Sequence, residues 1–426
     1  MFERVTILGA GVAGVAAAWA AAQRGAALRL FDGGLGASCL AGGAVDDRPW
    51  DEVARSAEVL QSLPRASSLP EAVRIFADDL GLWRLPPEGA LLPRLATSAG
   101  RTRLARGHDR ALLDLATLPA RARIALPTVS RPEWDADHLA RALSADAYAE
   151  SRALRFVAGE AKLLKHVGED RIPPAELAMR HDDPDRRGYL VERLREMLAR
   201  TGHVDAILLG PWLGCLDGQA EAIGEALGLP VGEILGEIGG AAGLRFEAAR
   251  AALLDPLGIG IEPYQARRIG KAGEELYVEL ESGERVVSDR LVIAVGGVAA
   301  GGIVYDPPEQ HATRGLPESG RVPWRLSIAG RLGFQARGRR LDVVGSIHGP
   351  ALDGEAWPTD ADPGLLECVG LATDGFAAIP GGELHGARIY AAGDVVADRP
   401  RTVLQAVFAG IHAGAAAGGE PGALSA

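Results

Sequence analysis

The chain has 426 residues, of which 47% are hydrophobic and 24% charged, as expected for a soluble globular protein of two or three domains. Its formal net charge of −11 argues against non-specific binding to nucleic acid or to an anionic membrane surface. The three cysteines, Cys39, Cys215 and Cys368, lie far apart. Their spacing argues against a disulfide framework, a metal site or an iron–sulfur cluster held by this chain alone.

Residues 5–22 are almost wholly apolar, which raises three interpretations: a signal peptide, a membrane anchor or the start of a nucleotide-binding fold. The stretch is mostly Ala and Gly, and the residues before it carry no net side-chain charge, so the first two interpretations are disfavoured. Residues 5–8 predict a short buried strand, and residues 12–24 predict an Ala-rich helix ended by Gly25. We therefore expect no transmembrane segment and a cytoplasmic protein.

A G-x-G-x-x-G motif occupies residues 9–14, between that strand and that helix. Gly9 would allow a tight turn, Gly11 a close approach of backbone to a pyrophosphate, and Gly14 close packing of helix on strand. Val12 and Ala13 would open the helix, whose N-terminal N–H groups attract phosphate. This arrangement predicts a dinucleotide site.

A second strand is predicted at residues 27–32 and ends in Asp32, 18 residues after Gly14. A carboxylate at about this distance typically accepts hydrogen bonds from a ribose. We expect the neighbouring Phe31 and Gly33 to contact the cofactor as well. The Gly-rich loop 33–43 then predicts backbone running along a pyrophosphate and ribityl chain, with contacts from three small residues, Ala37, Ser38 and Gly42; a flexible linker is the alternative.

Two later segments favour FAD over NAD, with FMN as the alternative flavin. Residues 275–288 alternate as a β-hairpin, and an apolar strand at residues 291–295 leads into Gly296. Residues 387–392 predict a strand ending in Gly393 and Asp394, followed by a helix from Thr402 to Ala417. This closing segment resembles the C-terminal FAD motif, in which the acid binds the ribityl hydroxyls.

The predicted fold class is α/β: a Rossmann-like FAD-binding domain of the two-dinucleotide-fold flavoprotein type, with an inserted α/β cap region. Within the inserted region, residues 189–200 predict an amphipathic helix and residues 204–210 a strand. The FAD-binding domain is expected to be assembled from three separate segments, residues 1–64, 255–304 and 363–426. Residues 65–254 form the cap or partner region between the first two segments, and residues 305–362 form a second insertion of the cap.

Several internal segments resemble the B subunit of the anaerobic glycerol-3-phosphate dehydrogenase. They are residues 36–46, 207–214, 240–246, 294–304 and 371–374. The resemblance implies an FAD-dependent oxidoreductase subunit that acts beside a second flavoprotein and an iron–sulfur subunit, associated with a membrane only through these partners. Residues 75–160 and 305–360 depart from the family pattern, and these are the segments expected to touch substrate.

Two residues are candidates for a catalytic role. His348 lies in the second insertion and Arg399 follows the Gly-Asp motif; the alternatives are a loop histidine and a surface arginine. Arg401 is a further candidate for contact with phosphate or an anionic substrate. The charged residues around His181, in the segment 180–184, predict that it lies in a solvated turn.

Three functions follow from these patterns. The leading hypothesis is a flavoprotein subunit of a dehydrogenase or electron-transfer complex. The second is a stand-alone FAD-dependent dehydrogenase or oxidase of a small hydroxy acid or amine. The third is a non-catalytic scaffold that keeps the fold without the cofactor; the intact glycines, Asp32 and Asp394 argue against it.

Overall fold

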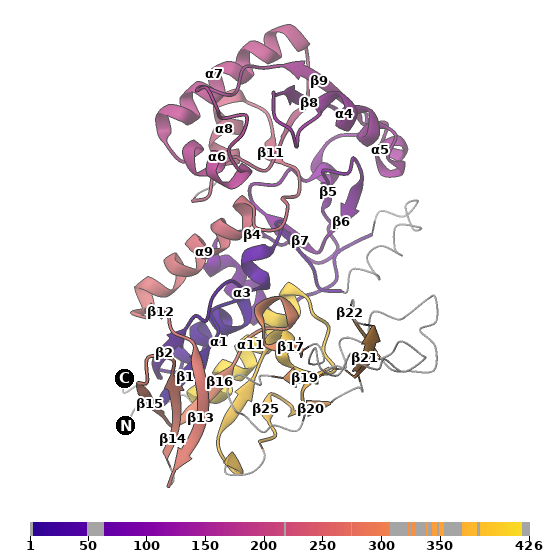
Figure 1. Ribbon diagram of the computed structural model, residues 1–426. Coiled ribbons are helices and arrows are strands. Elements are labelled where there is room, and N and C mark those ends of the chain that lie inside the picture. The colour runs from indigo at the N-terminus through magenta and orange to yellow at the C-terminus, as the bar shows by residue number, and fades with distance from the viewer. Residues whose placement is uncertain are drawn as a thin grey trace. The chain divides into compact units, whose positions relative to one another are not determined.

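The structure, a computed structural model, describes residues 3–48, 64–216, 219–273, 275–306, 322–323, 325–328, 338–339, 343–346, 349–352, 369–380 and 384–419. Its contacts divide the chain into two units (Figure 1). Unit 1 is made of residues 1–37 and 254–426, and unit 2 of residues 38–253. The sequence predicted the inserted region to begin at residue 65, whereas by contact unit 2 begins at Ser38. The described strands within 305–362, predicted to belong to the cap, fall in unit 1.

The main sheet of unit 1 has the strand order β12-β2-β1-β16-β26-β25-β24. The first five strands run parallel to one another. The hairpin of β24 and β25 closes one edge in the antiparallel sense. β1 and β16 are apolar along most of their length and buried, as strands of a parallel sheet are when both faces are covered. The α/β class with a parallel sheet is thus observed.

Two helices with small side chains, α1 (Val12–Ala22) and α11 (Val403–Gly418), pack closely together in unit 1. A Cβ on Gly410 would come 2.3 Å from the backbone oxygen of Ala13, and one on Gly414 would come 2.1 Å from that of Ala17. The two helix backbones are therefore in direct contact. α1 ends at Ala22, two residues before the predicted end, and the chain then turns through Gly25.

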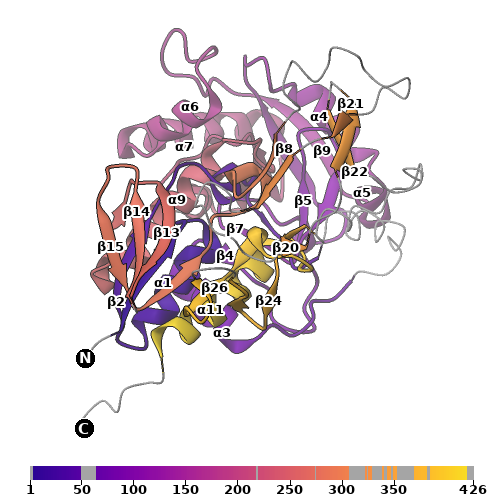
Figure 2. The same cartoon turned by 60° about the horizontal axis from the view of Figure 1, so that its bottom comes forward.

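The predicted hairpin is present as β14 and β15, and a third strand, β13, completes an antiparallel sheet (Figure 2). The strands of unit 1 are β1 (Arg4–Leu8), β2 (Ala27–Phe31), β12 (Ile261–Glu262), β13 (Ala266–Ala272), β14 (Glu275–Leu280), β15 (Arg285–Ser288), β16 (Arg290–Ile293), β17 (Ile303–Asp306), β18 (Val322–Pro323), β19 (Arg325–Ile328), β20 (Gly338–Arg339), β21 (Val343–Ser346), β22 (Gly349–Leu352), β23 (Gly370–Leu371), β24 (Thr373–Asp374), β25 (Ala377–Ala378) and β26 (Ile389–Ala391).

Unit 2 is built on a second parallel sheet, of order β11-β10-β8-β9. Its core includes Ile124, Leu126, Leu143, Leu194 and Trp212, all nearly inaccessible to solvent. The helix expected at residues 189–200 begins earlier, at Pro184, because Asp183 caps it by accepting a hydrogen bond from the backbone N–H of Asp185. The inserted region is therefore an α/β structure with its own core.

The strands of unit 2 are β3 (Ala44–Val45), β4 (Trp83–Arg84), β5 (Arg94–Ala96), β6 (Thr102–Leu104), β7 (Gly107–Asp109), β8 (Arg123–Thr128), β9 (Arg155–Glu160), β10 (Ala206–Leu209) and β11 (Val231–Glu233). Its helices are α3 (Glu71–Leu80), α4 (Ala136–Ser144), α5 (Ala147–Arg152), α6 (Pro174–His181), α7 (Pro184–Thr201), α8 (Gln219–Leu227) and α9 (Ala241–Leu254), the last of which ends at the boundary with unit 1.

Candidate dinucleotide site

The turn between β1 and α1 is held against two neighbouring strands. The backbone N–H of Gly9 donates to the carbonyl of Phe31 at 2.8 Å. Gly9 has φ = +103°, and a Cβ there would come 2.2 Å from the backbone oxygen of Ala294. A Cβ on Gly14 would come 1.7 Å from the oxygen of Gly9. Only glycine fits at these two positions.

Gly11 is the residue that precedes α1, in an extended conformation with φ −68° and ψ 179°. Gly11 stands at the N-cap position, and among the described residues no side-chain hydrogen bond caps α1 there. Val12 and Ala13 follow as its first buried residues. The first turn of α1 thus presents backbone N–H groups and the positive end of the helix dipole, which suits a phosphate.

The carboxyl end of β2 carries Phe31, Asp32 and Gly33. The backbone N–H of Asp32 donates to the carbonyl of Glu262 on β12 at 2.8 Å, and its Oδ1 accepts the N–H of Gly34 at 3.1 Å. The carbonyl of Gly33 accepts a hydrogen bond from Gln265 Nε2 at 2.6 Å. These contacts fix the turn in which Asp32 stands.

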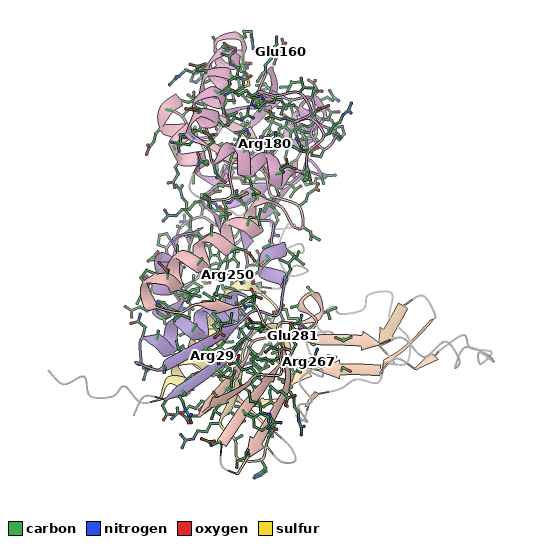
Figure 3. All side chains as sticks on the ribbon, turned by 60° about the vertical axis from the view of Figure 1, so that its left-hand side comes forward. Arg29, Glu160, Arg180, Arg250, Arg267 and Glu281 are labelled. Carbon is green, nitrogen blue, oxygen red and sulfur yellow. The ribbon has the colours of Figure 1, made fainter. Side chains whose placement is uncertain are left out.

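Arg29 lies on the same strand, β2, three residues before Asp32. Its guanidinium lies 5.0 Å from the centroid of the Phe31 ring and bonds to Glu262 and Glu284. Figure 3 marks the position of Arg29. Phe31 is buried, with 1% of its surface exposed. Its ring therefore packs in the protein, and its contact with a cofactor stays a prediction.

The ends of β16 and β26 meet beside the first turn of α1. Gly296 turns the chain after β16 with φ = +73°. A Cβ on the next residue, Gly297, would come 2.9 Å from the Cβ of Asp394. Gly393 has φ = +76°, and a Cβ there would come 2.8 Å from the Cβ of Ala13. The structure thus brings the predicted residues Ala13, Gly296, Gly393 and Asp394 together.

Asp394 is half-buried after β26, and burial raises the pKa of its carboxyl while Arg401 acts in the opposite direction. Thr402 caps α11, because its side chain accepts the backbone N–H of Gln405 at 3.3 Å. Since the carboxyl ends of β1, β2, β16 and β26 share one edge of the sheet, this edge is where α/β proteins of this class bind ligands.

The later residues of the Gly-rich loop belong to unit 2. Ala37 is the last residue of unit 1 before the insertion, and Ser38 is the first of unit 2. A short 3₁₀ helix spans Ala37–Leu40. Gly42 lies against the segment after β11: its carbonyl accepts the N–H of Gly236 at 2.9 Å. The prediction that Ala37, Ser38 and Gly42 contact the cofactor stays a prediction.

Of the two catalytic candidates, His348 lies outside the described residues. Arg399 donates from Nη2 to the carbonyl of Gly375 at 3.3 Å, and its guanidinium lies 5.4 Å from the centroid of the Phe376 ring. Together with Gly393 it lines a small cavity of about 10 Å³. Arg401 donates to the carbonyl of Val369 at 2.6 Å. These contacts hold both arginines to the protein backbone.

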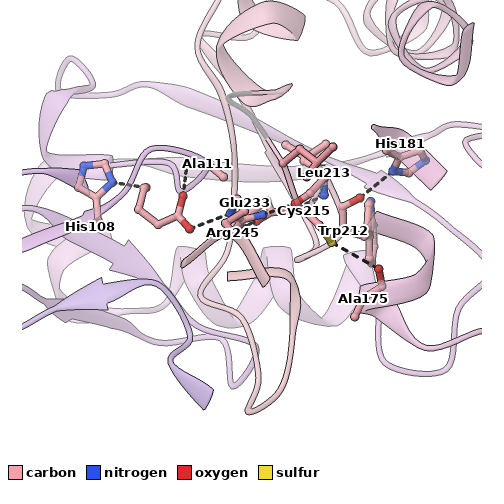
Figure 4. Close-up of polar contacts among 12 residues, drawn as sticks. His108, Ala111, Ala175, His181, Trp212, Leu213, Cys215, Glu233 and Arg245 are labelled. Atoms are coloured by element: carbon pink, nitrogen blue, oxygen red, sulfur yellow. Dashed lines mark hydrogen bonds and ion pairs between the residues drawn. The ribbon is translucent and has the colours of Figure 1, made fainter. Parts of the chain in front are cut away.

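No sequence pattern indicated the buried ionic network of unit 2, which Arg245, Asp109 and Glu233 form (Figure 4). Burial raises the pKa of Glu233 to about 7. Nearby, His181 is 3% exposed and its Nδ1 lies 2.7 Å from the carbonyl oxygen of Trp212, so the expectation of a solvated turn is wrong for this side chain. Burial lowers the pKa of His181 to about 4.

The described ranges of the chain contain two cysteines and no candidate metal site. Cys39 and Cys215 are buried and form no disulfide with a described residue, and burial raises the pKa of Cys215 to about 12. Within the described ranges, no group of three or more His, Cys, Asp or Glu side chains could hold a metal ion. The helices of these ranges also include none with the length and apolar character needed to span a bilayer.

No protein-family model and no curated protein matches the chain. Among solved structures, it is similar to glycine oxidase from Bacillus cereus ATCC 14579 (11% identity, 98% of this chain and 95% of that chain, TM-score 0.29). It is also similar to a ferredoxin–flavin thioredoxin reductase from Clostridium acetobutylicum (10% identity, 98% and 96%, TM-score 0.27). A third is iminodiacetate oxidase from Chelativorans sp. BNC1 (14% identity, 84% and 74%, TM-score 0.24).

The chain also matches tetracycline destructase Tet(51), of which it spans 44%. Glycine oxidase, thioredoxin reductase and iminodiacetate oxidase are oxidoreductases by name, and none of the three is a glycerol-3-phosphate dehydrogenase. At such low TM-scores these likenesses do not assign a function.

Proposed function

We propose that this chain is an FAD-dependent oxidoreductase with its dinucleotide site at the carboxyl edge of the unit 1 sheet. The observation that carries the proposal is the contact between Gly393 and Ala13, which joins the turn after β26 to the first turn of α1. The sequence assigned these two turns to the same cofactor on independent grounds. Their contact is what a shared ligand requires.

The residues at this edge fit a dinucleotide. Close packing at Gly9 and Gly14 fixes the turn, and Gly11, which precedes α1, has no side chain that would keep a diphosphate from the start of the helix. Asp32 would take the adenosine ribose and Asp394 the ribityl hydroxyls. Because FMN has no adenosine ribose, an acid at the end of β2 favours FAD. A bound flavin would supply the hydride and electron transfer, while these residues would hold and orient it.

The finer proposal is that the protein is a flavoprotein subunit of a dehydrogenase or electron-transfer complex. Its support is the resemblance of residues 36–46 and 294–304 to the B subunit of the anaerobic glycerol-3-phosphate dehydrogenase. On this proposal a second flavoprotein and an iron–sulfur subunit are its partners. The stand-alone oxidase or dehydrogenase of a small hydroxy acid or amine is the competing outcome.

The first experiment is a visible spectrum of the purified full-length chain, followed by chromatography of whatever denaturation releases. We expect flavin absorbance and released FAD. Gly11→Val should remove the flavin, and its thermal midpoint should nearly equal that of the flavin-free wild type, because φ at Gly11 suits any residue.

The matched control is Gly260→Val, an exposed position in the same unit where a Cβ would meet no described atom within 4 Å. It should keep its flavin. A colourless wild-type chain that takes up neither FAD nor FMN would overturn the proposal, and an unchanged flavin content in Gly11→Val would remove the assigned site.

A second experiment separates the complex subunit from the stand-alone enzyme. The flavin of the purified chain is mixed anaerobically with small hydroxy acids or amines. Reduction within seconds without any added protein would favour the stand-alone enzyme. Reduction only after native partners are added would support the complex subunit.

A further inference from the structure

The Cys39–Gly43 loop is held by three separate segments of unit 2. From β7, the backbone N–H of Asp109 donates to the carbonyl of Gly43 at 2.8 Å. From the segment after β11, the N–H of Gly236 donates to the carbonyl of Gly42 at 2.9 Å. A Cβ on Gly42 would come 2.4 Å from the oxygen of Gly236. The loop backbone is therefore clamped on two sides.

The third segment is α9. A Cβ on Gly243 would come 1.8 Å from the carbonyl oxygen of Cys39, so the helix backbone touches the loop backbone. One turn further on, Glu247 Oε1 accepts a hydrogen bond from the thiol of Cys39 at 2.8 Å. Arg250 bonds the same Glu247 oxygen at 3.2 Å. The start of the loop thus depends on where α9 lies.

One guanidinium joins these three segments (Figure 4). Arg245, on α9 between Gly243 and Glu247, donates from Nε to Asp109 Oδ2 at 2.7 Å and from Nη2 to Glu233 Oε2 at 2.8 Å. Its Nη1 donates to the carbonyl of Gly214 at 2.7 Å. Asp109 lies on β7, and Glu233 is the last residue of β11, just before the segment that reaches Gly42.

The geometry requires an arginine at this position. The Arg245 side chain is 4% exposed, and the side chains of Asp109 and Glu233 are 2% and 0% exposed. Each nitrogen of its guanidinium bonds a different partner. The single ammonium group of lysine cannot reproduce this planar, forked arrangement of donors. Buried polar and charged groups are costly unless they are paired, so shortening this side chain would leave the buried carboxyl groups of Asp109 and Glu233 without their donor and would loosen β7 and β11.

We propose that Arg245 is a positioning residue that sets the conformation of the Cys39–Gly43 loop and, through it, the affinity for the flavin. The second half of the proposal depends on the proposed function, because the sequence predicts that this loop runs along the flavin. The first half concerns the loop alone. It is tested without any cofactor.

The test compares Arg245→Lys with Arg131→Lys in the full-length protein. Arg131 is a matched control: its side chain is 1% exposed in the same unit, and it bonds the carbonyls of Glu169 and Ile172, which are remote in sequence from the loop. Hydrogen exchange is followed at the amides of Asp109 and Gly236, which the loop carbonyls protect. FAD is titrated into the flavin-free protein.

We expect Arg245→Lys to speed exchange at the amides of Asp109 and Gly236, and to weaken FAD binding, each by at least about tenfold. The amide of Ile207, bonded to the carbonyl of Pro230 beside β10, should keep its protection. Arg131→Lys should lower the thermal midpoint by a similar amount and leave FAD affinity within about twofold of the wild type.

The proposal is overturned if Arg245→Lys and Arg131→Lys bind FAD with equal affinity. It is also overturned if the amides of Asp109 and Gly236 exchange at equal rates in the two variants. Arg245 would then be a purely structural residue. A wild-type chain that binds no flavin would instead refute the proposed function, and the exchange data would still decide the role of Arg245 in the loop. If Arg245→Lys does not fold, the isosteric variant Asp109→Asn tests the proposal instead. It weakens the bond between Arg245 and residue 109 and should speed hydrogen exchange at the amide of Gly236 several-fold.

Discussion

Gly393 lies directly against Ala13: a Cβ on the glycine would come 2.8 Å from the Cβ of the alanine. The contact joins the turn after β26 to the first turn of α1. It continues along α11, where Gly410 lies on the backbone of Ala13 and Gly414 on that of Ala17. The two helices therefore pack closely from the edge at which we place the dinucleotide as far as Ala17.

Gly410→Ala should destabilise the protein. The added Cβ would come 2.3 Å from the carbonyl oxygen of Ala13, so α11 must move away from α1. We expect the free energy of unfolding to fall by about 1–3 kcal/mol, the usual cost of overpacking. Gly188→Ala, in a helical position of unit 2 where no described atom would lie within 4 Å, should instead gain roughly 0.5–1 kcal/mol. Urea denaturation measures both, and a stabilised Gly410→Ala would contradict the observed packing.

Asp394→Ala should weaken FAD binding. The half-buried carboxylate is the acceptor that we assign to the ribityl hydroxyls, and losing hydrogen bonds to a charged group costs roughly 1.5–3 kcal/mol, or about 10–100-fold in affinity. Fluorescence titration of the flavin measures the dissociation constant. Asp374→Ala, at an exposed position on β24, is the control and should bind as the wild type does. If the two variants bind FAD equally well, Asp394 does not contact the cofactor.

Glu233 should make the protein less stable as pH rises from about 4.5 to about 7. Burial raises the pKa of this carboxyl to about 7, against the opposing effects of Arg245 and the N–H of Leu213. Asp109 and Cys215 also lie near it, and Arg245 is the cation that faces it. In this window the folded protein keeps the proton and the unfolded chain has released it. The free energy of unfolding therefore falls by on the order of 1–3 kcal/mol, and the fall is complete above pH 7.

The comparison with Glu233→Gln isolates this contribution. His181, whose pKa burial lowers to about 4, gives the opposite slope between about pH 4 and 6.5, because there the unfolded chain binds the proton more readily. The difference in unfolding free energy between wild type and Glu233→Gln cancels the His181 contribution. If that difference does not change between pH 4.5 and 7, Glu233 does not titrate in this range.

The elements of unit 1 could be predicted because each is marked by its own local pattern. An apolar run that leads into a glycine turn specifies β1 and β16, and the Gly-rich turn with an Ala-rich sequence specifies α1. The contact of Gly393 with Ala13 also followed, since both turns had been assigned to one ligand. β13 was missed because its sequence, residues 266–272, is largely polar and gives no alternating pattern.

The Arg245 network could not be predicted, for a different reason. Asp109 lies 136 residues before Arg245, Glu233 lies 12 residues before it on a different element, and none of the three elements has a charged pattern of its own. Which carboxylate meets which guanidinium depends on how β7, β11 and α9 pack. His181 was placed wrongly for the same reason: its charged neighbours indicate solvent, but the carbonyl of Trp212 holds its ring inside unit 2.

The chain leaves the parallel sheet of unit 1 after β2 and rejoins it only at β12, once residues 38–253 have been passed. During synthesis, unit 2 is therefore complete and can fold while β1 still lacks β16, its second neighbour. An apolar strand with a bare edge readily pairs with other chains. Until β16 is made, the nascent protein thus exposes an apolar strand edge, and the strand concerned is the one that leads into the glycine turn.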